Sequence, residues 1–395
     1  MSATLGTAVV LAVVGLRFLV PLAIPRYPLP AILAALVLDA GDQTIFQQVP
    51  GLDIAGYQQY DKALDVFYLT IAYCSTLRNW SDPFAFGLSR VLFYYRLVGV
   101  LAFELSDARW LLLVFPNTFE YFFIAYELVR TRWAPVRLAR RQLVVAAAAI
   151  WVFVKLPQEY WLHVAELDVT DELKTRVFGV PVGAGWAAAL VHRPWVLLLA
   201  AALGVLVWAA LRWLVSRLPP ADWPSGFDVD VRARGGDIVG VPASVRARQG
   251  AFVRGPLLEK VLLVSMVSIV FAQILPGVRA THTQVVLTVA VVVVLNSVAS
   301  TWAAGRGAEW RSTAAQLVGV LVINTAIVLA LVVLPTPGGA SVDVPSALFF
   351  LVLLSLLVTL YDRYRMLRVL RRGGRLPYLW RLREAAGLQQ RALPR

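Results

Sequence analysis

The chain is poor in charged residues, which occupy only 15% of its 395 positions. Apolar residues occupy 59%, whereas a typical soluble domain is about half apolar and about a quarter charged. A soluble fold cannot bury so much apolar surface, but a lipid bilayer accepts it. The shortage of charge therefore excludes an ordinary soluble domain and predicts an integral membrane protein.

Cysteine and histidine are also scarce. Cys74 is the single cysteine, so a disulfide within the chain is impossible. The three histidines are scattered and show no zinc-ligand spacing, and the sequence has no glycine-rich loop of the kind that holds phosphates. We therefore expect no zinc site, no ATP-driven engine within the chain, and no nucleotide, haem or flavin cofactor.

Lysine is rare, and most of the basic residues behind the formal net charge of +13 are arginines. We interpret this preference as the codon bias of a GC-rich bacterium. The arginines crowd into a few segments between helices and into the C-terminal tail, which is typical of membrane topology and not of a groove that reads DNA. We expect no nucleic-acid partner. The expected partners are the lipid bilayer, anionic lipid headgroups at the basic tail, and another membrane protein or a second copy of the chain.

Long apolar runs predict an all-α fold, a polytopic transmembrane helical bundle of roughly eleven helices. No positively charged start or cleavage site accompanies the first run, so we expect a retained helix and not a signal peptide. Residues 227–248 alternate apolar and polar side chains around Gly235 and Gly236, which predicts a small cytoplasmic β-hairpin. The predicted helices cover residues 3–24, 29–46, 61–79, 84–105, 109–130, 141–160, 193–215, 256–276, 283–302, 311–335 and 345–363.

The arginine-rich segments also orient the predicted bundle. They follow the fifth, seventh, ninth and eleventh helices, so all of them lie on one side, which the positive-inside rule makes cytoplasmic. We predict a multi-pass protein of the cell (plasma) membrane with its N-terminus outside and its C-terminus cytoplasmic. Its predicted parts are a polar N-terminal bundle with the candidate site (1–160), an extracytoplasmic loop (161–192), an apolar C-terminal bundle (193–362) with a cytoplasmic insertion (216–255), and a basic cytoplasmic tail (363–395).

Charged residues within predicted spans concentrate between residues 29 and 130. A charge at the centre of a membrane helix costs at least about 2.5 kcal/mol, so such residues usually face a bundle interior and mark a site. Asp39 and Asp42 end the second predicted helix, Asp61 and Asp65 begin the third, and each pair shares one helix face. A short connection brings the four carboxylates together.

Four carboxylates in one place repel one another unless a cation lies between them. Hard divalent ions such as Mg²⁺, Mn²⁺ or Ca²⁺ suit this set of oxygen ligands. The four aspartates are therefore a candidate site for a divalent cation. The alternative is that Asp39, Asp42 and Asp61 are simply solvated at helix ends.

The spacing of these aspartates resembles that of the CDP-alcohol phosphotransferases, whose motif is Asp-x-x-Asp-Gly-x-x-Ala-Arg, then eight or nine residues, then Gly-x-x-x-Asp-x-x-x-Asp. The resemblance covers residues 39–65 and implies two metal ions held by the aspartates, with Asp65 as the base that activates an acceptor hydroxyl. Family sites face the cytoplasm, whereas the eleven-helix topology places this cluster outside. The family's first glycine, alanine, arginine and second glycine are replaced here by Gln43, Phe46, Gln47 and Tyr57.

A second group of polar residues lies deeper in the predicted spans. Arg96 falls within the fourth predicted helix and Glu120 within the fifth, where Pro116 breaks the hydrogen-bond ladder beside Asn117. Together with Asp65, these residues predict an ion-paired relay that gates a proton or a cation. The alternative is a buried salt bridge that locks the third to fifth helices together.

These features lead to three functional hypotheses. The first is transport or flux of a cation or a proton-coupled solute through an acidic, extracytoplasmic site. The second is a metal-dependent membrane lipid enzyme that is similar to the CDP-alcohol phosphotransferases in its aspartate spacing. The third is a membrane scaffold or complex subunit, because the helices after residue 256 are apolar runs with few polar groups.

Overall fold

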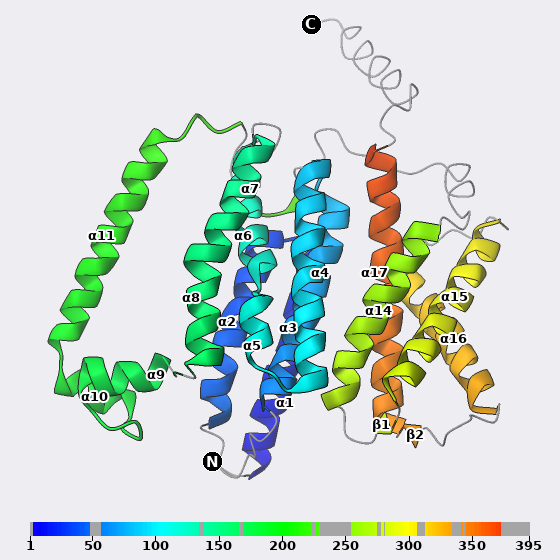
Figure 1. Cartoon of the computed structure of the whole chain (residues 1–395), viewed down its shortest axis with the longest axis horizontal. Helices are drawn as coiled ribbons and strands as arrows, with labels where there is room; N and C mark the ends of the chain where they lie inside the picture. The colour runs from blue at the N-terminus through cyan, green and yellow to red at the C-terminus, as the bar shows by residue number, and fades with distance from the viewer. Residues whose placement is uncertain are drawn as a thin grey trace, which may run out of the picture.

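In the computed structural model of this protein, the helices form an upright bundle (Figure 1). The structure describes residues 3–47, 57–133, 138–165, 167, 169–222, 226–229, 254–274, 278–279, 281–305, 313–333, 341–342 and 344–372.

The N-terminal part of the bundle contains two kinds of helix. The long helices stand roughly parallel to one another, whereas α9 and α10 lie at the lower end of the bundle in Figure 1. These elements are α1 (Ala3–Leu19), η1 (Val20–Ala23), α2 (Pro28–Gln47), α3 (Tyr57–Asn79), α4 (Pro83–Ser106), α5 (Trp110–Val114), α6 (Thr118–Arg130), α7 (Arg140–Ala149), η3 (Ile150–Lys155), α8 (Leu156–Glu159), η4 (Tyr160–Val164), α9 (Val169–Glu172), η5 (Leu173–Phe178), α10 (Trp186–His192) and α11 (Trp195–Arg217).

The C-terminal part is a group of long helices beside the first part, joined at its lower end by one short strand pair (Figure 1). Strand β1 pairs antiparallel with β2, with Val278 opposite Val342. The elements are α14 (Arg254–Ile274), β1 (Val278–Arg279), α15 (His282–Gly305), α16 (Thr313–Val333), β2 (Ser341–Val342) and α17 (Val344–Arg372).

Helix α3 is the centre of the fold. Every side chain over residues 63–77 is buried, and the helix packs against α2, α4, α14 and α17. Tyr73 stacks on Phe93 of α4 with ring centroids 4.6 Å apart, an arrangement that contributes about 0.5–1.5 kcal/mol beyond burial. Because α3 contacts both parts of the bundle, polar groups along it are enclosed by protein and not by lipid.

Local sequence signals set both ends of α4. Asp82 caps the N-terminus by accepting a hydrogen bond from the Phe84 backbone N–H at 2.8 Å, and Pro83 occupies the first turn, where a missing N–H leaves no intrahelical bond unmade. Asp107 ends the helix with a left-handed backbone, φ 53°, which aspartate tolerates better than most residues. These signals hold α4 against α3 in a defined register.

The all-α class predicted from the sequence agrees with the structure, but the count of eleven helices is not supported. Five helices in the described part of the chain are long and apolar enough to cross a membrane. Helix α3 falls short because four charged residues interrupt it, and three further apolar helices are too short by the same measure. The five are Pro83–Ser106, Trp110–Arg130, Arg140–Leu162, Trp195–Arg217 and Pro345–Arg365.

The predicted β-hairpin at residues 227–248 lies outside the described residues from 230 onward, so the hairpin is not supported. The predicted basic tail likewise lies outside them from residue 373 onward. Its first ten residues continue α17 to Arg372. Two of its arginines contact protein: Arg368 donates to the Trp80 carbonyl at 2.9 Å, and Arg365 pairs with Glu259 at 3.3 Å.

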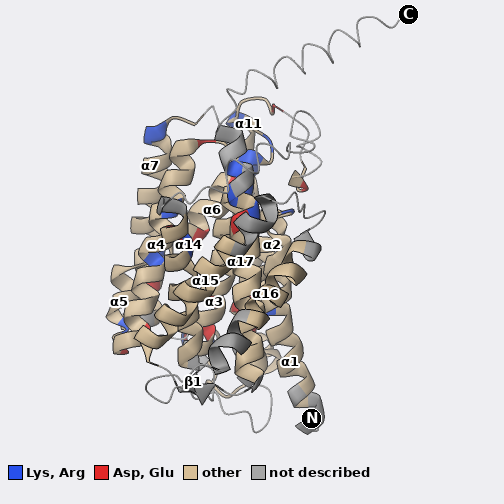
Figure 2. Ribbon diagram, turned by 90° about the vertical axis from the view of Figure 1, so that its right-hand side faces the viewer, with Lys and Arg blue, Asp and Glu red and all other residues tan. Residues whose placement is uncertain are grey.

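The two ends of the bundle differ in charge. Helix α1 begins at the lower end in Figure 1, whereas α7 begins and α17 ends at the upper end. Lysine and arginine gather in the upper half in Figure 2. Helix α11 is a further asymmetry, because its described side chains are exposed along almost its whole length.

Candidate functional site

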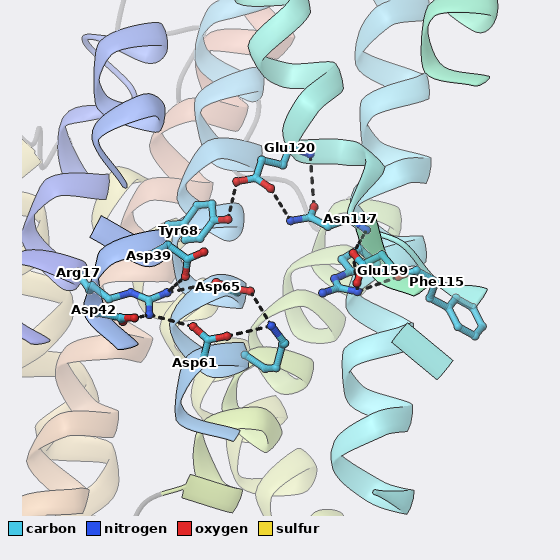
Figure 3. Close-up of polar contacts among 12 residues, drawn as sticks. Arg17, Asp39, Asp42, Asp61, Asp65, Tyr68, Phe115, Asn117, Glu120 and Glu159 are labelled. Carbon is cyan, nitrogen blue, oxygen red and sulfur yellow. Dashed lines mark hydrogen bonds and ion pairs between the residues drawn. The ribbon is translucent and has the colours of Figure 1, made fainter. Parts of the chain in front are cut away.

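The structure brings together the four aspartates that the sequence singled out. Asp39 and Asp42 lie on α2, Asp61 and Asp65 lie on α3, and the antiparallel hairpin places them face to face (Figure 3). We call these four residues the aspartate cluster. Asp42 is fully buried and Asp65 is 6% exposed. The alternative that Asp42 is merely solvated at a helix end is therefore excluded by its burial.

A single guanidinium contacts all four carboxylates. Arg17 of α1, itself 3% exposed, donates through Nη1 to Asp42 and to Asp61, the latter at 3.1 Å. It donates through Nη2 to Asp39 and to Asp65, the latter at 3.2 Å. The sequence interpretation did not select Arg17. The available signal was a lone charge within the apolar run of the first helix, which is expensive in a membrane unless it has a partner.

Lys62 is the second cation at the aspartate cluster. Its Nζ lies 2.9 Å from an Asp61 oxygen and 3.5 Å from an Asp65 oxygen. In the described part of the chain, the ion pairs of the cluster thus join four carboxylates to two cations, Arg17 and Lys62. Four carboxylates held this close together repel one another, and in a buried place that repulsion favours nearby cations or protonation.

The ligand geometry suits one hard cation. One carboxylate oxygen from each of Asp39, Asp61 and Asp65 lies within 4.8 Å of the others. Ca²⁺ takes oxygen ligands at about 2.3–2.6 Å and Mg²⁺ at about 2.0–2.1 Å, so oxygens around one ion stand at most about 5 Å apart. The spacing is within this limit for Ca²⁺, whose ligands stand furthest apart, and the choice among Mg²⁺, Mn²⁺ and Ca²⁺ stays a prediction from the sequence.

A second buried polar group surrounds Glu120, deeper in the bundle. Glu120 accepts a hydrogen bond from the Tyr68 hydroxyl at 2.6 Å and from the Asn117 side-chain amide at 2.9 Å. The Lys155 Nζ lies 3.5 Å from Oε2 of Glu120. Because Tyr68 is one turn beyond Asp65 on α3, its hydroxyl links the helix that carries the aspartate cluster to Glu120 (Figure 3).

Glu159 completes this second group. It accepts from the Asn117 backbone N–H at 3.2 Å and lies 3.7 Å from an Arg96 nitrogen. Arg96 also donates to the Phe115 carbonyl at 3.0 Å. That carbonyl is available because Pro116 interrupts the helix between α5 and α6, as the sequence predicts. We call Arg96, Glu120, Lys155 and Glu159 the glutamate cluster; its charges balance.

The contacts differ from those of the predicted relay. Asp65 pairs with Arg17 and Lys62, Arg96 pairs with Glu159, and Glu120 pairs with Lys155. The direct chain of contacts from Asp65 through Arg96 to Glu120 is thus not the pairing that the described residues show, and Glu120 is instead contacted by Tyr68 of α3. The sequence interpretation did not select Lys155 and Glu159, although their spacing of four residues within the predicted helix at 141–160 was an available signal.

No family model, no curated protein and no solved structure matches the chain. The interpretation of the site therefore depends on its geometry and charge.

Proposed function

We propose that the chain is an integral membrane protein of the cell membrane that moves a cation, or a solute coupled to protons, and that the aspartate cluster is its cation-binding site. The observation that carries this proposal is the convergence of four carboxylates on two cations within a buried part of an apolar helical bundle. Ionisable side chains inside a membrane protein usually face its interior and mark a path or binding site for ions or protons. The cofactor or cargo is a divalent cation, Mg²⁺, Mn²⁺ or Ca²⁺.

The path beyond the cluster supports movement and not only binding. From Asp65, the next polar group along α3 is Tyr68, whose hydroxyl donates to Glu120, and Glu120 lies beside Lys155. A hydroxyl that donates to a carboxylate can relay a proton to it by exchanging donor and acceptor roles. We propose that Tyr68 acts in this way and couples cation binding at Asp65 to protonation of Glu120.

The experiment is cation flux into liposomes that contain the purified protein and a fluorescent indicator of divalent cations. The wild type is expected to admit Mn²⁺, and Asp65→Asn is expected to reduce the flux to the level of empty liposomes. Asp228→Asn is the matched control, because Asp228 pairs with exposed Arg26 outside the cluster. Equal flux in Asp65→Asn and the wild type would contradict transport through this site.

A second candidate function is a metal-dependent membrane lipid enzyme. The convergence of the four aspartates on a helix hairpin, at the spacing that resembles the CDP-alcohol phosphotransferases, favours it. The test is release of CMP from a CDP-linked lipid in the presence of Mn²⁺ and an alcohol acceptor. Turnover that is lost in Asp65→Asn, without flux in liposomes, would replace the transport proposal with this one.

We propose an orientation with the N-terminus outside and the C-terminus in the cytoplasm. The arginine-rich end of the bundle then faces the cytoplasm and the aspartate cluster opens toward the outside. Single cysteines in a Cys74→Ser background test this. Ser106→Cys, exposed at the lower end of α4, is expected to react with a membrane-impermeant maleimide on intact cells, whereas exposed Ser216→Cys, at the other end, reacts only after permeabilisation.

Partner proposals follow from the same orientation. The basic tail is proposed to lie on anionic headgroups of the cytoplasmic leaflet. The exposed length of α11 favours lipid or another membrane protein around it, and so keeps the subunit hypothesis as a third proposal. That role is favoured if flux and turnover are both absent and another membrane protein co-purifies with the chain, a result that deletion of α11 should abolish.

A further inference from the structure

We propose that an anionic phospholipid binds where α4, α14 and α17 meet in the upper half of the bundle. Arg90 and Arg365 hold the lipid phosphate, and the acyl chains lie along the exposed apolar surface of α4 and α14. The site is separate from the aspartate cluster and does not depend on the proposed cation site.

Two guanidinium groups share one carboxylate oxygen at this place. Oε2 of Glu259 on α14 lies 3.3 Å from Nη1 of Arg365 on α17 and 3.9 Å from Nη1 of Arg90 on α4. Its other oxygen, Oε1, accepts a hydrogen bond from the Tyr73 hydroxyl of α3. Two positive charges thus adjoin one negative charge whose oxygens are both engaged, and this arrangement favours an added anion.

Both arginines keep hydrogen-bond donors that protein groups do not use. Arg90 makes no hydrogen bond to a described residue, because 3.9 Å is too long for one, and its side chain is 50% exposed. Arg365 uses only Nη1, which donates to Glu259 and, at 2.6 Å, to the Tyr361 hydroxyl. A guanidinium carries five N–H donors in a planar fork that matches phosphate oxygens. The remaining donors are therefore suited to a phosphate.

The Tyr94 hydroxyl is a further donor at the same place. Its oxygen is buried and has no hydrogen-bond partner among the described residues, which is an unfavourable state for a hydroxyl. The Tyr94 ring packs edge-on against Tyr73 with centroids 5.7 Å apart, and its hydroxyl lies within electrostatic reach of Glu259 and Arg90. An anion bound beside Arg90 would supply the missing acceptor.

The surface below the two arginines suits acyl chains. Val91 and Val98 of α4 and Leu262 of α14 are exposed, and the two helices pack against each other. Both helices begin at the upper end of the bundle in Figure 1, so Val98 lies farther from that end than Arg90. A phospholipid has the same order, with its phosphate at the interface and its chains toward the membrane centre. Basic sites between membrane helices bind anionic headgroups in this way.

The test is native mass spectrometry of the purified protein in detergent, with phosphatidylglycerol and phosphatidylcholine supplied in equal amounts. The wild type is expected to retain phosphatidylglycerol in preference. Arg90→Gln is expected to retain it about fivefold less, the contribution of roughly one arginine to binding of anionic lipid. Arg212→Gln is the matched control and should equal the wild type, because Arg212 is likewise an exposed arginine over an aromatic ring, 5.4 Å from that of Trp208.

Tyr94→Phe separates lipid binding from a structural role. Its hydroxyl has no described protein partner to lose, so the melting temperature is expected to stay at the wild-type value while retention of phosphatidylglycerol falls. Retention equal to the wild type would contradict the place of this hydroxyl in the site.

Three further outcomes would overturn the proposal. Equal retention of the two lipids by the wild type, or of phosphatidylglycerol by Arg90→Gln and the wild type, would remove the site. Displacement of the lipid by excess inorganic phosphate would show that acyl chains are not required, and would remove the lipid as the occupant. If Arg90→Gln does not fold, Arg90→Lys decides: lysine lacks the planar fork, so it should retain less phosphatidylglycerol than the wild type, and equal retention would contradict the site.

Discussion

The aspartate cluster and the glutamate cluster are neighbours in the bundle, because Tyr68 lies one turn beyond Asp65 on α3 and donates to Glu120, but the two clusters pair their charges differently. In the glutamate cluster, Glu120 pairs with Lys155 and Glu159 with Arg96. In the aspartate cluster, four carboxylates share Arg17 and Lys62. Both clusters are enclosed by the same bundle, so the difference is not one of environment. We therefore expect the glutamate cluster to hold the helices together and propose that the aspartate cluster binds a cation.

The C-terminal part of the bundle follows the balanced pattern. Lys260 of α14 lies 2.9 Å from Asp362 of α17 and donates to Ser297 of α15 at 2.6 Å. Asn324 similarly donates to Ser355 at 2.9 Å. These contacts join neighbouring helices with matched partners. Matched partners thus hold these helices of the C-terminal part together.

The comparison predicts its largest effect on stability at Lys155. Lys155→Met leaves buried Glu120 without its cation, which typically costs about 3–5 kcal/mol. Chemical unfolding in detergent measures the loss, and the double variant with Glu120→Gln is expected to recover most of it. Asp61→Asn is expected to leave stability unchanged or higher, because it removes part of the excess negative charge. Equal destabilisation by both changes would erase the distinction between the clusters.

The next largest effect is on cation affinity, and here we expect the aspartate cluster to be the more sensitive of the two. Asp61→Asn removes a ligand and one negative charge, and is expected to weaken Mn²⁺ binding by about 100-fold, the upper range for changes close to a metal. Glu159→Gln, at the balanced cluster, should leave the affinity nearly unchanged. Isothermal titration with Mn²⁺ compares them. If Glu159→Gln weakened Mn²⁺ binding more than Asp61→Asn did, the cation would lie at the glutamate cluster, and the proposed site would be contradicted.

Tyr68→Phe sharpens the comparison, because Tyr68 lies on the helix of the aspartate cluster and its hydroxyl donates to Glu120 of the glutamate cluster. Its loss removes a buried hydrogen bond to a charged acceptor, worth about 1.5–3 kcal/mol. Mn²⁺ affinity should remain, whereas flux into liposomes should fall, since the proton path is interrupted. Flux equal to the wild type, measured at matched protein content, would show that Glu120 is not coupled to the site.

The smallest effect is expected where a charge pair is exposed. Arg176 is largely exposed and pairs with Glu172 one turn earlier in the chain. Glu172→Gln should change the free energy of unfolding by at most about 1 kcal/mol, because water screens such a pair. A larger loss would mean that this outer segment packs against something in the membrane.

Much of the fold and part of the site could be predicted from the sequence. Apolar runs located the helices, and the i,i+3 and i,i+4 spacings on either side of a short connection placed the four aspartates together. The partner Arg17 could not be predicted, because which face of the first helix meets α2 and α3 depends on packing. The pairing of Glu120 with Lys155 also depends on packing, because no local sequence pattern determines which face of the helical segment that carries Lys155 turns toward α6. The count of eleven membrane helices is not supported, and α3 shows one reason: its charged residues keep it below the hydropathy of a span, although the protein around it largely buries them.

The measurement that tests the account most directly is the position of Mn²⁺ in crystals grown with the ion, found from its anomalous scattering. The account predicts one peak among the carboxylates of Asp39, Asp61 and Asp65. No peak at the aspartate cluster at saturating Mn²⁺ would contradict it.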